Sequence, residues 1–269
     1  MKTLFFADFD YTMWMHGDPG QTERNKRAIQ EYRKRGGKFA LATGRSLMSL
    51  MEDFPDYREY LDFLMAYDGA LTYVVTPRGE EEIFRINIPP REVTEITSIV
   101  RGTEGDYRRD MVYLCGMGEY RKIPSRRWGR MPGQLGINKI RIWCEDVEDC
   151  RQLTEALSER DYNGYSYYDI PPESNFDIGR LHWVSDQARS AIEVLPRDVN
   201  KGEIIRALQG RFFRDYRIVT AGDDVNDISM IKLFDGYVVG QKGKTKLAES
   251  LPEAKTAATL AEVLDEIKV

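Results

Sequence analysis

The stretch KTLFFADFDYT, residues 2–12, decides the fold. Its first six residues are apolar enough for a strand that is buried on both faces, which is typical of a parallel sheet. The strand ends at two acids one residue apart, Asp8 and Asp10. In open α/β sheets ligands bind at the carboxyl ends of the strands, so these acids mark a candidate site. A charged turn is the alternative, because aspartate is also common where strands end.

Three later segments repeat this pattern of an apolar run that ends in polar residues. Residues 38–42 end at Thr43-Gly44-Arg45, residues 62–67 end at Asp68-Gly69-Ala70, and residues 217–221 end at GDDVND, residues 222–227. Such strands, alternating with helices, predict an α/β fold with a doubly wound parallel sheet. After the first motif the sequence predicts a loop over 13–21 and a helix over 23–35 with Thr22 as its N-cap. The other predicted elements are a short helix over 46–51, a hairpin of 71–75 and 82–88, and helices over 200–208 and 259–267.

The pattern changes at Pro89-Pro90 and resumes near residue 196. The sequence therefore predicts a core of residues 1–88 and 196–269, interrupted by an inserted α+β cap domain at 89–195 with an antiparallel sheet. Its predicted helices are 91–100 and a helix capped by Asp146 that ends near 160, and its predicted strands are 111–115, 139–144, 164–168, 180–185 and 191–195.

Composition excludes several classes of protein. The net charge of −5 gives no reason to expect a nucleic-acid partner. No stretch is long and apolar enough to span a bilayer, and the acid at Asp8 breaks any signal-peptide pattern, so we expect a cytoplasmic protein. Three cysteines with no zinc spacing predict reduced structural thiols.

The acids of the first and last polar motifs predict a metal site if their strands are neighbours. Asp8, Asp10, Asp223, Asp224 and Asp227 would repel one another and raise each other's pKa values unless a cation lay among them. Oxygen ligands and positions left open for water and phosphate suit Mg²⁺. A lysine at a predicted helix start supplies a second positive charge at residue 201, and a strand end before a helix start suits phosphate at Thr43. An ordinary N-cap is the alternative there.

These residues suit attack by a carboxylate on a phosphoryl group, and together they resemble a family. DFDYT at 8–12, TGR at 43–45, Lys201 and GDDVND at 222–227 are similar to the four ordered motifs of the haloacid dehalogenase-like (HAD-like) phosphohydrolases. The insertion between the second and third motifs resembles that of the Cof-like subfamily with a type IIB cap. The resemblance implies a Rossmannoid core, a cap, Mg²⁺ as cofactor and small phosphorylated metabolites as substrates.

The resemblance also implies roles for single residues. Asp8 would be the nucleophile and a Mg²⁺ ligand. Asp10 would protonate the leaving oxygen and later deprotonate the hydrolytic water, while its backbone carbonyl contacts the metal; Asp223 would complete the metal ligands. The remaining roles are binding of phosphoryl oxygens by Thr43, Gly44 and Lys201, orientation of phosphate or metal-bound water by Asn226 and Asp227, and support of the loop by Thr12.

Two departures from the family pattern concern the site. Tyr11 stands where glycine is usual, and Asp68 stands where asparagine is usual. Tyr11 adds bulk beside the site, and Asp68 adds an acid that would either repel an anionic substrate or bind a sugar hydroxyl.

The predicted function is a Mg²⁺-dependent phosphatase of small phosphorylated metabolites, with sugar phosphates first among them. The alternatives are a phosphomutase of the phosphomannomutase type and a regulator that binds a phosphometabolite without turnover. The oligomeric state and the exact substrate do not follow from the sequence. Candidate cap residues, each with packing or a solvated loop as its alternative, are Arg141, His182, Trp183, the tyrosines at 162, 165, 167 and 168, and the basic residues at 121, 122, 126, 127 and 130.

Overall fold

The structure, a computed structural model, describes residues 2–102, 110–116, 119–122, 136–144, 146–170, 189–240 and 246–269. The chain divides into two compact units. Unit 1 comprises Met1–Gly44, Phe54–Phe84 and Asn200–Val269, and unit 2 comprises Arg45–Asp53 and Arg85–Val199. The mixed α/β architecture predicted from the sequence is confirmed, with a large, mainly parallel sheet in unit 1.

Unit 1 is built on a sheet with the strand order β13-β12-β11-β1-β2-β3-β4-β5 in the described residues. Neighbouring strands from β13 to β3 run parallel, and β4 runs antiparallel to β3. The first strand is central and buried along its length from Thr3, as its apolar run predicts. The strands are β1 (Lys2–Ala7), β2 (Lys38–Ala42), β3 (Phe63–Ala66), β4 (Leu71–Thr76), β5 (Gly79–Arg85), β11 (Tyr216–Gly222), β12 (Asp235–Val239) and β13 (Lys255–Ala257).

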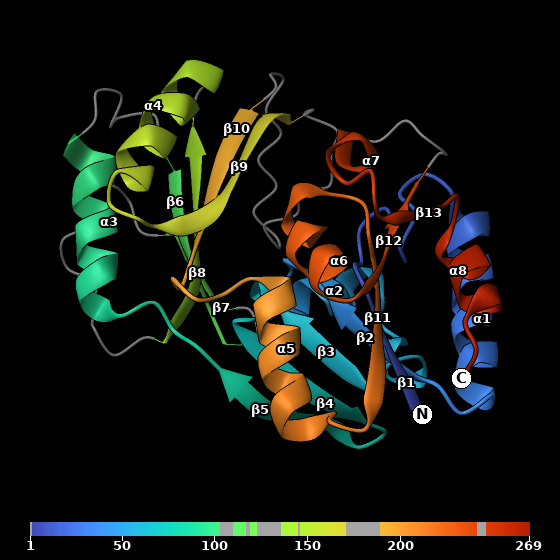
Figure 1. The fold of residues 1–269 in the computed structure, drawn as a ribbon. Coiled ribbons are helices and arrows are strands. Elements are labelled where there is room, and N and C mark those ends of the chain that lie inside the picture. Colours follow the sequence, from blue (N-terminus) through green and yellow to red (C-terminus); the bar gives the residue numbers. More distant parts are fainter. Residues whose placement is uncertain are drawn as a thin grey trace. The chain divides into compact units, whose positions relative to one another are not determined.

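Helices cover both faces of this sheet. Two of them, α1 (Pro19–Lys34) and α8 (Leu260–Glu266), pack together on one side, while α5 (Lys201–Phe212) and α6 (Ile228–Leu233) lie together on the other (Figure 1). Helices on both faces make the sheet doubly wound, and they leave its strand ends as the place for a site. The other helical segments are α2 (Leu47–Asp53), which groups with unit 2, α7 (Lys246–Ser250), and the 3₁₀ turns η1 (Tyr57–Glu59), η2 (Tyr67–Gly69) and η5 (Val225–Asp227).

The start of α1 corrects one prediction. The helix begins at Pro19 rather than at residue 23, and its N-cap is Asp18, whose Oδ1 accepts a hydrogen bond of 2.8 Å from the Gln21 amide. Proline suits the first turn because its missing N–H has no partner there. Thr22 is instead buried inside the helix, where its hydroxyl accepts a bond from the Met15 amide.

Unit 2 contains an antiparallel sheet with the strand order β7-β6-β8-β10-β9 in its described residues. Two helices, α3 (Pro90–Gly102) and α4 (Val147–Ser158), pack on one face of this sheet around a core that includes all three cysteines, each buried (Figure 1). Asp146 caps α4 as predicted, accepting from the Asp149 amide. The predicted strand at 180–185 lies outside the described residues. The strands are β6 (Asp110–Cys115), β7 (Glu119–Lys122), β8 (Ile137–Cys144), β9 (Asn163–Ile170) and β10 (Arg189–Leu195).

In the described part of the chain, no helix has both the length and the apolar composition needed to cross a membrane. The domain boundaries at 88/89 and 195/196, and the assignment of the insertion as a cap, stay predictions.

Candidate active site

The strand order brings the first and last polar motifs to one edge of the sheet. Strands β1 and β11 are parallel neighbours in which Ala7 lies opposite Ala221. The Asp8 amide continues this pairing with a hydrogen bond of 2.9 Å to the Ala221 carbonyl. Asp8 and Asp223 therefore lie at the same carboxyl end of the sheet, although 214 residues separate them in the chain.

Three carboxylates meet at this edge. Asp8, Asp223 and Asp227 each place one oxygen within 4.8 Å of the others, and Asp8 and Asp227 are buried. The Thr12 hydroxyl donates a bond of 2.7 Å to Asp223 Oδ1, which ties the loop after β1 to the loop after β11. Hard oxygen donors at this spacing fit a divalent cation such as Mg²⁺. The donor set therefore fits the metal that the sequence predicts.

Lys201 is the positive partner of this cluster. It is the first residue of α5, whose N-cap is Asn200, and its side chain has no solvent exposure. Its Nζ donates to Asp8 Oδ1 and to Asp227 Oδ1, each at 2.6 Å. The next residue, Gly202, allows α5 to pack closely on α6, because a Cβ there would lie 2.5 Å from the Ser229 backbone. One buried cation is thus shared by two buried acids.

Burial and crowding raise the pKa of every acid in the cluster. Burial raises the pKa of Asp8 well above its ordinary value against the opposing effect of Lys201, and the charges of Asp227 and Asp10 raise it further. Burial also raises the pKa of Asp223 well above its ordinary value, and Asp8 and Asp227 add to the increase. For Asp227 burial outweighs the pairing with Lys201 and two backbone N–H groups, so its pKa is raised too.

The pKa of Lys201 shifts in the direction that keeps it charged. Burial alone would lower it, but the carboxylates of Asp227, Asp8 and Asp68 outweigh burial and hold the lysine pKa well above its ordinary value. The local charge stays negative because one ammonium faces several acids. Such a site attracts a cation.

Asp227 has a structural role as well as an electrostatic one. Its Oδ2 accepts hydrogen bonds from the amides of Asp223 at 3.0 Å and Asp224 at 3.1 Å, which closes the loop after β11. Gly222 makes room for it, since a Cβ there would lie 2.3 Å from Asp227 Cγ. The same carboxylate therefore shapes the loop and holds Lys201.

Asp10 is not part of the three-carboxylate cluster. Its Oδ1 lies 2.7 Å from His16 Nε2, and both side chains are partly buried. His16 was not predicted as a site residue, because the sequence shows only a histidine in a loop. The contact depends on how that loop turns.

Two of the residues predicted to bind phosphate, Thr43 and Asn226, are linked through Asp68 by hydrogen bonds. Asn226 donates through Nδ2 to Asp68 Oδ1 at 3.0 Å, and the Asp68 amide donates to the carbonyl of Thr43 at 2.9 Å. Gly44 follows Thr43 at the end of β2. Asp68 is fully buried in a left-handed backbone conformation with φ of 56°. The extra acid thus contacts Asn226 and adds to the field at Lys201.

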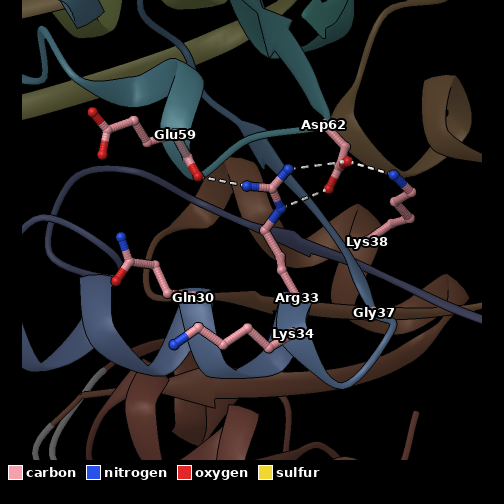
Figure 2. Close-up of a pocket in the computed structure, with 7 residues that line it drawn as sticks. All are labelled: Gln30, Arg33, Lys34, Gly37, Lys38, Glu59 and Asp62. Carbon is pink, nitrogen blue, oxygen red and sulfur yellow. Dashed lines mark hydrogen bonds and ion pairs between the residues drawn. The ribbon is translucent and has the colours of Figure 1, made fainter. Parts of the chain in front are cut away.

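A pocket elsewhere on unit 1 has positive side chains but does not fit a phosphate site (Figure 2). Arg33 donates to Asp62 from Nε at 3.1 Å, and Lys38 donates to it at 2.7 Å. The Phe39 amide also donates to this buried carboxylate. Both Arg33 and Lys38 are already paired with the Asp62 carboxylate, so we interpret this cluster as structural. The pocket has a volume of about 470 Å³ and is lined by Gln30, Arg33, Lys34, Gly37, Lys38, Glu59 and Asp62.

The candidate cap residues are placed only in part. Arg141 contacts the buried Glu193, which also accepts from the buried Lys139 at 2.6 Å, and the guanidinium lies 6.0 Å from the centre of the Trp143 ring. Tyr162 and Tyr165 are partly buried. His182, Trp183 and the basic residues at 126, 127 and 130 lie outside the described residues, as do the side chains of residues 121, 122, 167 and 168.

Comparisons with known proteins agree with this fold. A family model described as haloacid dehalogenase-like hydrolase matches residues 5–250. A solved structure from Thermotoga maritima is 20% identical, with 100% of this chain and 98% of that one covered and a TM-score of 0.69. A subclass IIB sugar phosphatase of the HAD superfamily is 18% identical over 97% and 95% of the chains, with a TM-score of 0.66.

A third solved structure, of a Plasmodium vivax protein assigned to the HAD/COF-like hydrolases, is 17% identical over 98% and 94% of the chains, with a TM-score of 0.71. The search of curated proteins found no match. At these identities the structural likeness establishes the fold.

Proposed function

The chain belongs to the haloacid dehalogenase-like hydrolase family, and we propose that it is a Mg²⁺-dependent phosphatase of small phosphorylated metabolites, sugar phosphates first among them. The single observation that carries the proposal is the position of Asp8: it directly follows β1, pairs with Lys201 at 2.6 Å, and has an oxygen within 4.8 Å of two further carboxylates. The likeness to a subclass IIB sugar phosphatase supports the substrate class.

In the proposed reaction Asp8 is the nucleophile. Its carboxylate oxygen attacks the phosphorus of the monoester, the bond from phosphorus to the leaving oxygen breaks, and Asp10 gives that oxygen a proton. Water then attacks the aspartyl phosphate, Asp10 takes the proton of the water, and inorganic phosphate leaves with Asp8 regenerated. Both acids return to their starting states, so the cycle balances.

The other site residues bind and orient. Lys201 holds Asp8 in place and offsets negative charge on the phosphoryl oxygens, as a buried cation does effectively. Thr43, Gly44 and Asn226 are proposed to bind phosphoryl oxygens, and Asp227 to hold Lys201 and the loop after β11.

Asp8, Asp223 and the Asp10 backbone carbonyl are proposed to hold Mg²⁺, which when bound would neutralise charge on the substrate. Residues 89–195 are proposed to form a cap on a core of 1–88 and 196–269, and the protein is proposed to be cytoplasmic.

The test compares two aspartate variants on a panel of phosphorylated metabolites, with and without Mg²⁺. Asp8→Asn is nearly isosteric, so we expect a folded protein without measurable turnover. Asp18→Asn makes the same substitution at an exposed N-cap, where asparagine caps as well as aspartate, and should match wild type.

Mass spectrometry of acid-quenched enzyme should find phosphate on the peptide that contains Asp8. Turnover by Asp8→Asn would contradict the proposal. A requirement for a sugar bisphosphate activator would favour a phosphomutase instead.

A further inference from the structure

The loop after the first motif folds back tightly on itself. The Trp14 amide donates to the Phe9 carbonyl at 2.7 Å, and the Tyr11 amide donates to the Trp14 carbonyl at 2.8 Å. The rings of Phe9 and Trp14 stack with their centres 5.7 Å apart. This turn returns the chain to the level of Asp10 within a few residues, so His16 lies beside it.

The contact between His16 and Asp10 is partly shielded from water. Nε2 of the imidazole lies 2.7 Å from Asp10 Oδ1, and the two side chains are 17% and 34% exposed. Tyr11 covers the imidazole, with its ring centre 5.0 Å from that of His16. A hydrogen bond in such a place holds its partners more firmly than one in bulk water.

The far side of the loop is anchored on α1. The Met15 amide donates to the Thr22 hydroxyl at 2.9 Å, and the Asp18 amide donates to the Met15 carbonyl at 3.0 Å. Asp18 is also the N-cap of the helix. The backbone at His16 is therefore fixed by a tight turn on one side and by a helix of 16 residues on the other.

The geometry points to His16 as a positioning residue that holds the Asp10 carboxyl in the orientation needed to pass a proton to the leaving oxygen. This inference rests on the proposed function, in which Asp10 is the acid and base. A partly exposed carboxyl without such a partner samples several rotamers, and each departure from the aligned geometry slows proton transfer. His16 restricts the rotamers of Asp10 before substrate binds, because the loop that carries His16 is already ordered by its own contacts.

The test uses two variants that differ by one methylene group. His16→Gln places an amide group near the position of Nε2 and keeps a hydrogen-bond partner for Asp10, whereas the shorter side chain of His16→Asn cannot reach it. The substrates are benzyl phosphate, whose alkoxide leaving group needs a proton, and 4-nitrophenyl phosphate, whose leaving group does not. We expect His16→Asn to lower kcat/KM for benzyl phosphate by roughly 10- to 100-fold, and for 4-nitrophenyl phosphate by less than about threefold.

A second readout follows from the later step of the reaction. Hydrolysis of the aspartyl phosphate needs Asp10 as a base whichever substrate formed it. His16→Asn should therefore show a burst of nitrophenolate, equal to the enzyme concentration, before a slower steady state. For His16→Gln, kcat/KM should lie within about threefold of wild type on both substrates. This variant should not show the burst of nitrophenolate that we expect for His16→Asn.

Outcomes for this inference and for the proposed function are separable. An equal loss on both substrates, or no loss on either, would overturn the role of His16 even if Asp8→Asn is inactive. Equal behaviour of the asparagine and glutamine variants would overturn it too, since general damage to the loop affects both. Turnover by Asp8→Asn would overturn the proposed function itself, whatever the histidine variants do.

Discussion

Replacing Lys201 with methionine tests how strongly this site depends on its buried cation. Methionine fills a similar volume but has no charge, so Asp8 and Asp227 lose a partner that each contacts at 2.6 Å. Neither acid can turn to water, because Asp227 is fully buried and Asp8 is 7% exposed. The variant therefore leaves uncompensated charge inside the protein.

The loss of stability should be about 4 kcal/mol at about pH 7. Breaking a buried ion pair by removing one partner typically costs about 3–5 kcal/mol. The variant can remove the uncompensated charge at the lowest cost in free energy by binding a proton at one of the two acids. At about pH 7 this costs about 4 kcal/mol, because an ordinary aspartate pKa lies roughly three pH units lower. At about pH 5.5 the same proton costs about 2 kcal/mol less.

The sign of the pH dependence follows from the direction of the pKa shifts. The pKa values of Asp8 and Asp227 are raised in the folded state, so folded protein binds protons more tightly than unfolded protein. Their protonation favours folding in acid, and this contribution is lost as pH rises through the raised pKa. Removing Lys201 raises both pKa values further, so the deficit of the variant must shrink as pH falls.

The assay is urea unfolding with a chelator present, at about pH 7 and about pH 5.5. We expect the variant to be less stable than wild type by about 4 kcal/mol at the higher pH and about 2 kcal/mol at the lower one. Still lower pH is avoided, because the lowered pKa values of Glu80 and Asp235 make their own contributions fall as acid is added.

Lys26→Met is the matched control. Lys26 is also largely buried and contacts Asp56 at 2.7 Å, but the Asp56 side chain is 38% exposed and can be rehydrated. Its loss should be about 1 kcal/mol or less and the same at both pH values. A Lys201→Met deficit below about 1 kcal/mol, or one equal at the two pH values, would refute the view that Lys201 neutralises buried acids.

Three further changes test other parts of the structure. Gly222→Ala forces a Cβ to within 2.3 Å of Asp227 Cγ, so kcat in a phosphatase assay should fall roughly 100-fold, and an unchanged rate would contradict the described packing. Glu193→Gln removes the carboxylate that the buried Lys139 contacts at 2.6 Å, so unit 2 should lose about 3 kcal/mol in urea unfolding, and a neutral effect would count against that pair. Mg²⁺ should raise the temperature of thermal unfolding less at about pH 5.5 than at about pH 7.5, because the raised pKa of Asp223 lets protons compete there; a pH-independent shift would contradict this.

The sheet and the acidic cluster could be predicted because each depends on a strong local signal. An apolar run in the sequence indicates a buried strand, and β1 occupies residues 2–7 as that run predicts. The acids that follow β1 and β11 then meet because the carboxyl ends of parallel neighbours share an edge. Lys201 was predicted for a weaker reason, its place at a helix start, and the structure puts it in contact with Asp8.

The rest depended on conformations that the sequence does not reveal. Pro19 read as a loop residue, yet it occupies the first turn of α1 because Asp18 caps it. His16 meets Asp10 only because a tight turn reverses the chain between them. Asp68 reaches Asn226 from a left-handed backbone that is uncommon for a residue with a side chain. Periodicity describes regular elements and cannot predict such turns.

The cysteines give unit 2 a built-in reporter of its own opening. All three are buried, with exposures of 6%, 1% and 0% at Cys115, Cys144 and Cys150, and all belong to that unit. A thiol reagent in solution can modify them only when the core around them separates from its neighbours. The rate of labelling in unmodified protein thus reports the opening of unit 2, and a ligand that slows it stabilises the closed form of that unit.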